Sequence, residues 1–251
     1  MPYVTVGKEN SGDIQLYYED HGSGDPLVLI HGYPLSGTSW EKQLPVLLQV
    51  GHRIITYDRR GFGKSSRPTA GYNYDTFAED LHKVVSHLKL HDFALVGFSM
   101  GGGEVARYFG KYGSKGVSKA VIIGGVPPYL LKAADNPDGV DSSVFEGIQK
   151  AVASDRYAFF TEFFKNFFNT DVFLGKRISE QAVQASWNVA AGASATASLP
   201  AYRRGMKTSA MIWLVSMFPH WSFTVTPTAS YPSRPQASRP PSWSREPGWW
   251  P

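Results

Sequence analysis

Four short, nearly continuous apolar runs constrain the fold of this chain more than any other feature. They are PLVLI at 26–30, RIITY at 53–57, FALV at 93–96 and AVII at 120–123. Strands with this pattern are buried on both faces, and such strands occur in parallel sheets with helices on either side. The runs therefore predict the inner strands of a parallel sheet.

Helical patterns lie between these runs. Ser39–Val50 opens with a residue suited to an N-cap, and Thr76–Leu88 places apolar side chains on one helical stripe. Ahead of the first run, residues 4–6 and 14–19 predict two short strands joined by a turn at 9–13, a hairpin. Alternating strands and helices predict an α/β fold with a doubly wound, mostly parallel sheet.

Charge and composition change abruptly near Tyr202. The chain carries a net charge of +4, yet residues up to Tyr202 are close to neutral, and from Arg203 onward Glu246 is the only acid among six basic residues. This last stretch is also rich in Pro, Ser and Trp. Because the basic charge sits outside the segment that is expected to pack, we expect no nucleic-acid binding.

Other chemistries are excluded by what the sequence lacks. There are no cysteines, so disulfides, thiolate metal sites and a cysteine nucleophile are excluded. The opening MPYVTVGKENSGD lacks the basic-then-apolar pattern of a secretory signal, and no apolar run approaches the roughly 20 residues that cross a bilayer. We expect a soluble, cytoplasmic protein that binds no membrane.

The strongest motif is Gly97-Phe98-Ser99-Met100-Gly101, directly after the FALV run and before a helical pattern. In this G-x-S-x-G pattern a tight strand-to-helix turn projects the serine over the sheet edge, and glycines leave room for the neighbouring chain. The helix start also directs backbone N–H groups, notably that of Met100, toward a developing oxyanion. We predict that Ser99 is a nucleophile.

A second segment agrees with this prediction. His31-Gly32-Tyr33-Pro34 follows the PLVLI run, where an oxyanion hole takes its other backbone donor, and the N–H of Tyr33 is the candidate. A general base must reach the Ser99 hydroxyl, and a histidine that opens this loop more often supports it. We therefore expect His31 and Gly32 to support the loop.

Together these stretches resemble a known family. LIHGYPLSGTSW, YDRRGFGKSSRP, DLHKVVSHL and LVGFSMGGGEVARYFG occur in the order and spacing of the α/β-hydrolases, and resemble most the bacterial cofactor-free haloperoxidases, or perhydrolases, and aryl esterases. The resemblance implies a hydrolase domain at 1–199, with Ser99 as catalytic residue, Tyr33 and Met100 as oxyanion donors, and Gly97 and Gly101 shaping the elbow. It also implies a helical cap at about 130–198.

The resemblance further implies a substrate class and no cofactor. Relatives of this kind act on carboxylic esters or acids, some with hydrogen peroxide to give a peracid, without metal, haem or flavin. Phenylalanines of the expected cap would mostly pack, and a few would line an acyl pocket. Two rival motifs are incomplete: Gly61–Ser65 ends like a phosphate loop but has Asp58 where glycine is required, and Gly101–Ala106 imitates a dinucleotide fingerprint without its acid.

The expected catalytic partners are missing. In this fold an acid and then a histidine follow the serine, but the only histidine after Ser99 is His220, a weak candidate, and no acid precedes Glu246 in the basic stretch. Without these groups we expect only the residual rate that oxyanion donors and binding supply. The family's last strands and closing helix would also be missing, so we expect poor folding.

A shifted reading frame explains this ending. Codons for 205–209 can be chosen so that a two-base offset reads HEDF, and the same offset converts 221–230 into VIHGDSDGI, which resembles the family segment around the acid. We therefore interpret 200–251 as a tail outside the family pattern, irregular and read out of frame from near Pro200. The alternatives are a catalytically inactive homologue that only binds, and a tail that binds acidic surfaces.

Overall fold

A single six-stranded sheet organises the chain, in the order β1-β2-β4-β3-β5-β6. The computed structural model describes residues 2–125, 132, 134 and 136–199. The strands are β1 (Tyr3–Glu9), β2 (Gly12–His21), β3 (Pro26–Ile30), β4 (Arg53–Tyr57), β5 (Phe93–Phe98) and β6 (Val117–Ile123). Strands β4, β3, β5 and β6 are parallel, whereas β2 is antiparallel to both neighbours. The predicted mostly parallel α/β sheet is confirmed.

The apolar runs locate the inner strands closely. Strands β3 and β4 have the predicted bounds, and the predicted hairpin is the β1–β2 pair. Strand β5 continues two residues past the predicted end, to Phe98, and β6 begins three residues earlier, at Val117. Glycine and polar residues interrupt the apolar pattern at both extensions, so the pattern does not predict them. The backbone stays extended there because β5 and β6 pair with each other.

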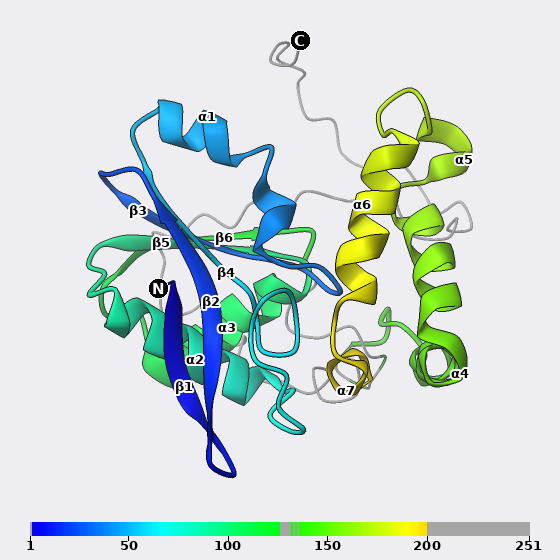
Figure 1. Cartoon of the computed structure of the whole chain (residues 1–251), viewed down its shortest axis with the longest axis horizontal. Coiled ribbons are helices and arrows are strands. Elements are labelled where there is room, and N and C mark those ends of the chain that lie inside the picture. Colours follow the sequence, from blue (N-terminus) through cyan, green and yellow to red (C-terminus); the bar gives the residue numbers. More distant parts are fainter. Residues whose placement is uncertain (1, 126–131, 133, 135, 200–251) are drawn as a thin grey trace.

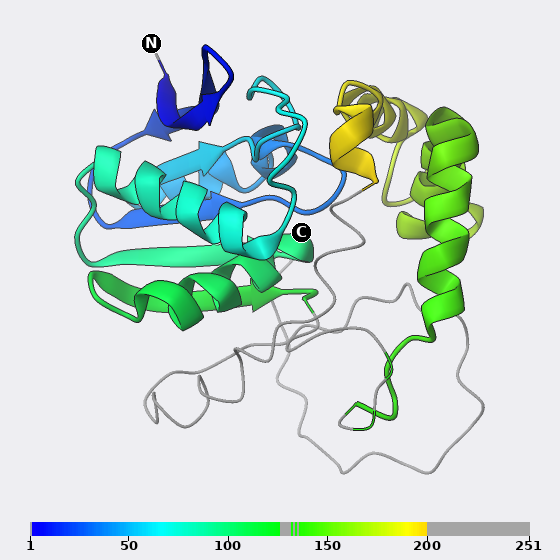
Figure 2. The ribbon, with the colours of Figure 1, turned by 90° about the horizontal axis from the view of Figure 1, so that it is seen from below.

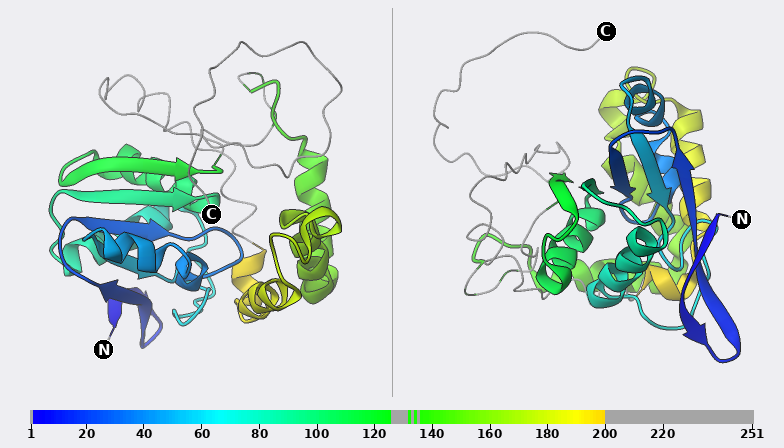
Figure 3. Two further views of the ribbon diagram at one scale, coloured as in Figure 1. Left: turned by 90° about the horizontal axis from the view of Figure 1, so that it is seen from above. Right: turned by 90° about the vertical axis from the view of Figure 1, so that its left-hand side faces the viewer.

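Helices cover both faces of this sheet (Figures 1 and 3). Helices α2 (Tyr74–His87) and α3 (Met100–Tyr112) lie on one face, against the main apolar core. On the other face lie the 3-10 turn η1 (Gly37–Trp40) and the short helix α1 (Leu44–Gln49). The sheet is thus the middle of three layers, with loops at the carboxyl ends of its strands gathered at one edge.

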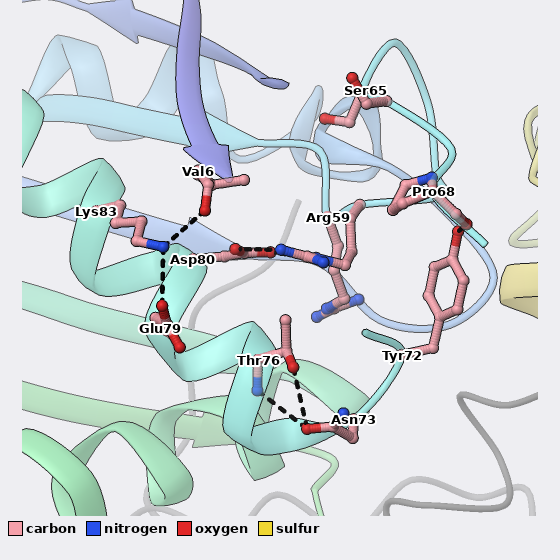
Figure 4. Close-up of polar contacts among 12 residues, drawn as sticks. Val6, Arg59, Ser65, Pro68, Tyr72, Asn73, Thr76, Glu79, Asp80 and Lys83 are labelled. Carbon is pink, nitrogen blue, oxygen red and sulfur yellow. Dashed lines mark hydrogen bonds and ion pairs between the residues drawn. The ribbon is translucent and has the colours of Figure 1, made fainter. Parts of the chain in front are cut away.

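Helix α2 shows the predicted apolar stripe but begins earlier than predicted. Its N-cap is Asn73, whose side chain accepts a hydrogen bond from the Thr76 N–H at 3.0 Å (Figure 4). The prediction placed the start at Thr76 because Asn73 was not considered as a cap. Of the predicted stripe residues, Phe77, Leu81, Val84 and Val85 are buried, whereas Leu88, the C-cap, is half-buried.

The predicted single helix over Ser39–Val50 is wrong. The segment divides into η1 and α1, and α1 begins at Leu44 with Pro45 in its first turn. Proline has no N–H to donate and disfavours helical backbone at the residue before it, so a helix starts at Pro45 more readily than it passes through it. Ser39 therefore does not cap this helix.

A second group of helices follows β6. These are α4 (Ser142–Phe167), α5 (Thr170–Phe173), α6 (Glu180–Ala191) and α7 (Ala195–Ser198), and they stand beside the sheet as a separate layer (Figure 2). Helix α4 is kinked at Asp155, whose carboxylate accepts the N–H groups of Tyr157 and Ala158 and so starts the second half of the helix anew. Within the segment expected to form a cap, the described residues form these four helices, joined by non-helical stretches such as 136–141 and 174–179.

The end of this helical layer returns to the sheet edge. The Ser194 N–H donates to the Gly61 carbonyl at 2.7 Å, and the Tyr33 hydroxyl donates to the Ser198 carbonyl at 3.3 Å. These bonds join α7 to loops that follow β3 and β4. Across the described ranges, no helix is both long and apolar enough to span a membrane.

Candidate active site

Ser99 lies at the turn between β5 and α3, with unusual backbone angles. Its φ is +52° and its ψ is −114°, a combination that a residue with a Cβ rarely adopts and that costs on the order of 1–3 kcal/mol. Ser99 is the N-cap of α3, yet its side chain makes no capping hydrogen bond, and the residue is only partly buried. The turn therefore presents a hydroxyl that its own helix does not use.

Three glycines let neighbouring chain approach this turn. A Cβ at Gly97 would collide with the Gly101 carbonyl, and one at Gly101 would lie 2.5 Å from the Ile30 carbonyl oxygen. A Cβ at Gly32 would lie 2.9 Å from the Phe98 ring and 3.3 Å from the Ser99 Cβ. The elbow and the loop after β3 are thus in direct contact, which larger side chains would prevent.

We expect Gly101→Ala to destabilise the protein by about 1–3 kcal/mol, because the added methyl meets backbone that cannot rotate away. Gly147→Ala is the matched control: Gly147 is also helical, and a Cβ there would meet no heavy atom of the described chain within 4 Å. The control should raise stability slightly, since alanine favours helix. Thermal unfolding of both variants decides, and a Gly101→Ala variant as stable as the wild type would contradict this packing.

The two predicted oxyanion donors lie on the two segments that meet here. Met100 is the first residue of α3, and the first N–H groups of a helix have no acceptor within it. Tyr33 follows Gly32, the residue packed against Ser99, on the loop after β3. The structure thus brings the segments of Ser99, Tyr33 and Met100 together, while the donor roles of the two amides stay predictions.

His31 is fully engaged in supporting its loop. Its Nε2 accepts the Arg59 backbone N–H at 3.0 Å, so the ring proton must be on Nδ1, which donates to the Gly32 carbonyl at 2.9 Å. Burial, together with the Arg59 charge, lowers the pKa of His31 well below its ordinary value, and the ring is neutral. Neither nitrogen is left to take a proton from Ser99.

A buried ion pair lies behind the same loop. The Arg59 Nε donates to Glu104 Oε2 at 2.8 Å, and both side chains are 0% exposed. The Tyr57 hydroxyl donates to the other Glu104 oxygen. Burial raises the pKa of the Glu104 carboxyl, although the Arg59 charge beside it acts in the opposite direction.

An aromatic wall from α4 faces the elbow. Phe163 and Phe167 stack with ring centroids 5.7 Å apart. Phe163 meets the Tyr33 ring edge-on at 6.2 Å, and Phe167 meets the Phe98 ring at 6.3 Å. Since Phe98 precedes Ser99 and Tyr33 carries a predicted donor, this wall, defined by these four rings, gives the site an apolar side.

The rival motifs have other structural uses. In the Gly61–Ser65 loop the Lys64 N–H donates to the buried carboxylate of Asp58, where a phosphate loop would bind its ligand. The Gly101–Ala106 segment lies within α3. In the described part of the chain, no three His, Asp or Glu side chains are placed to hold a metal ion.

Some predictions lie outside the described residues, and some site residues were missed. His220 and the stretch that we interpret as read out of frame fall among the residues that are not described. The described residues therefore do not test whether His220 acts as a base for Ser99. Arg59 and Glu104 were not singled out, although both lie in the motif stretches that carry the family resemblance. Glu104 was marked by its charge as the one acid in its motif stretch, whereas Arg59 lies between two other charged residues and no comparable signal marks it.

Comparisons with known proteins agree on one fold family. The family whose sequence model matches is described as the alpha/beta hydrolase fold, and the match covers residues 25–207. A Synechocystis sp. protein named as a non-heme chloroperoxidase is 66% identical over 199 residues, covering 79% of this chain and 72% of that protein. A non-heme haloperoxidase of Rhodococcus erythropolis is 41% identical over 207 residues, 82% of this chain and 73% of that protein.

Solved structures agree. A bromoperoxidase from Bacillus anthracis superimposes with a TM-score of 0.76 at 48% identity, covering 83% of this chain and 74% of that one. The esterase EaEST from Exiguobacterium antarcticum superimposes with a TM-score of 0.74 at 30% identity, covering 84% and 74% of the two chains. From the sheet, the serine turn and these matches together, the chain belongs to the α/β-hydrolase fold family, among relatives that are haloperoxidases and esterases.

Proposed function

We propose that this chain is a serine-dependent hydrolase of small carboxylic esters, with Ser99 as nucleophile. The observation that carries the proposal is the geometry of Ser99: a strained, partly exposed serine at a strand-to-helix turn, with a hydroxyl that does not cap its helix. Strain of this kind persists where the surrounding structure enforces it and is concentrated at functional sites. The names of the related haloperoxidases and esterases support the same reaction class.

In the proposed reaction, the Ser99 oxygen attacks the ester carbonyl and forms a tetrahedral oxyanion. The hydroxyl proton of Ser99 passes to water, and the departing alcohol later takes a proton from water. The amides of Tyr33 and Met100 donate to that oxyanion, and its collapse expels the alcohol and leaves an acyl-serine. Water then attacks the acyl-serine, releasing the carboxylic acid and the free hydroxyl. Hydrogen peroxide in place of water releases a peracid, which oxidises halide in solution; a related Acinetobacter calcoaceticus protein is named a bifunctional esterase/perhydrolase.

The aromatic wall supports a preference for apolar acyl or aryl groups. Its rings from α4, the loop after β3 and the end of β5 offer an apolar surface beside Ser99, which is the usual lining of a small-molecule site. Small, uncharged esters are therefore the substrate class that fits best.

Hydrolysis of p-nitrophenyl acetate tests the proposal. We expect Ser99→Ala to lower the rate to the residual level that the oxyanion donors and binding supply, because the variant cannot form the acyl intermediate. Ser186→Ala is a suitable control, since Ser186 lies in α6 and its hydroxyl donates to the Ala182 carbonyl one turn earlier in the same helix. Equal rates for wild type and Ser99→Ala would remove Ser99 from the chemistry.

A catalytically inactive homologue is the second candidate. It is favoured by one observation, that His220 is the only histidine after Ser99 and that the pattern of acid and then histidine is missing. Such a protein would bind an ester without turning it over. Two results together would identify it. The wild type and Ser99→Ala would hydrolyse p-nitrophenyl acetate at the same rate, and the wild type would still bind the ester.

A further inference from the structure

Arg59 connects two segments of the candidate site from behind. Its guanidinium donates to Glu104 on α3 and, through its second terminal nitrogen, to the His31 carbonyl at 3.0 Å. Its backbone N–H donates to the His31 ring. Arg59, a single residue in the loop after β4, therefore contacts both the loop after β3 and the helix α3, whose N-cap is Ser99.

Glu104 completes this connection. One of its carboxylate oxygens accepts from Arg59, in the loop after β4, and the other accepts from the hydroxyl of Tyr57, the last residue of β4. Both oxygens of the carboxylate are therefore fixed. The helix is close to the loop at this level, since a Cβ on Gly101 would lie 3.1 Å from the His31 carbonyl oxygen. Arg59 and Glu104 thus join the helix that contains the Met100 amide to the loop that contains the Tyr33 amide.

We infer that Arg59 and Glu104 are positioning residues that fix the separation of the Tyr33 and Met100 amides around Ser99. Oxyanion donors act only within a narrow range of distances, about 2.7–3.1 Å from the developing charge, and misplacement by about 1 Å costs roughly 100-fold in rate. The inference rests on the proposed function. It adds a role for a buried ion pair that contacts no substrate.

The neighbouring residue supplies a matched control. Arg60 forms the same kind of buried pair with Asp80 on α2, through bonds of 2.6 and 2.7 Å. This pair joins the loop after β4 to α2, and its two hydrogen bonds reach neither the loop after β3 nor the helix α3. Replacing a buried ion pair by apolar side chains of similar volume is often neutral for stability, which makes double replacement of either pair a usable variant.

The test compares Arg59→Met/Glu104→Leu with Arg60→Met/Asp80→Leu in the full chain. Diisopropyl fluorophosphate reports on the site, because the Ser99 oxygen bonds to phosphorus, fluoride leaves, and the hydroxyl proton passes to solvent. We expect the first double variant to react about tenfold or more slowly once the probe is bound, with its binding constant unchanged within about threefold. The second should match the wild type in both values.

Hydrogen exchange of the backbone gives a readout that needs no reactive serine. Amides of the 31–36 segment should exchange faster in Arg59→Met/Glu104→Leu than in the control variant, measured by mass spectrometry of peptides. If the first double variant does not fold, Tyr57→Phe removes only the bond to Glu104, and a fall of about threefold in the bound-state rate is expected.

Each outcome bears on one claim. Equal losses in both double variants, or unchanged exchange and reaction in the first, overturn the positioning role. A wild type that reacts no faster than Ser99→Ala overturns the proposed function instead, while the exchange comparison still decides whether the pair holds the loop.

Discussion

A chain whose frame is restored after Pro200 should hydrolyse p-nitrophenyl acetate at least about 10³-fold faster than the chain as it stands. The reason is chemical. A serine hydroxyl at its ordinary acidity is a weak nucleophile, and it needs an imidazole to take its proton and an acid to orient that imidazole. With codons chosen to suit, the shifted frame can read HEDF and VIHGDSDGI, which resemble the family segment before and around the acid, whereas His220 is the one histidine after Ser99 in the present sequence.

The coding DNA around Leu199 is the first measurement. We expect that a one-base insertion or a two-base deletion there opens the frame that carries an HGDxD segment, and that the corrected gene gives the gain in rate. The control is the corrected chain with Ser99→Ala, which should lose the whole gain. DNA that cannot be shifted into such a frame would show that the interpretation of the 200–251 stretch is wrong.

Glu104→Gln should destabilise the fold by about 3–5 kcal/mol. The replacement keeps the shape of the side chain but turns an oxygen that accepts from Arg59 into either a neutral acceptor or an opposing N–H₂ group. Because Arg59 is 0% exposed, water cannot compensate its charge, and a buried cation without its partner is costly. For a chain of this size the loss lowers Tm by roughly 10 °C.

Glu79→Gln is the matched control for that result. Glu79 also accepts from basic side chains, from Lys83 at 2.8 Å (Figure 4) and from Lys111 at 3.4 Å. Its side chain, however, is 44% exposed. An exposed pair contributes about 0–1 kcal/mol, so this variant should melt close to the wild type. Thermal or denaturant unfolding of the two variants gives the comparison, and similar values would show that burial does not govern the Arg59–Glu104 pair.

The sheet could be predicted from sequence because its pattern is local. Strands such as Pro26–Ile30 and Arg53–Tyr57 are buried on both faces, so their boundaries coincide with apolar runs. The helix over Ser39–Val50 was wrong because apolar spacing alone was followed past Pro45. Burial therefore marks where strands begin and end more clearly than periodicity marks a short helix.

The turn at Ser99 could also be predicted because its pattern is local, whereas the buried Arg59–Glu104 pair could not. The turn at Ser99 needs particular residues at adjacent positions, so G-x-S-x-G carries its geometry within five letters. Arg59 and Glu104 are 45 residues apart, and they meet because the loop after β4 and the start of α3 lie at the same edge of the sheet, where parallel strands end. Only the folded chain shows that an arginine and a glutamate in two motif stretches form one buried pair. A catalytic role for His220, the one histidine after Ser99, stays a prediction.

Mapping of the residue that reacts with diisopropyl fluorophosphate tests the nucleophile most directly. After reaction of the full chain, digestion and mass spectrometry of the peptides should place the phosphoryl adduct on Ser99, with none in Ser99→Ala. An adduct on another residue, or undiminished reaction of the Ser99→Ala variant, would contradict the assignment of this serine.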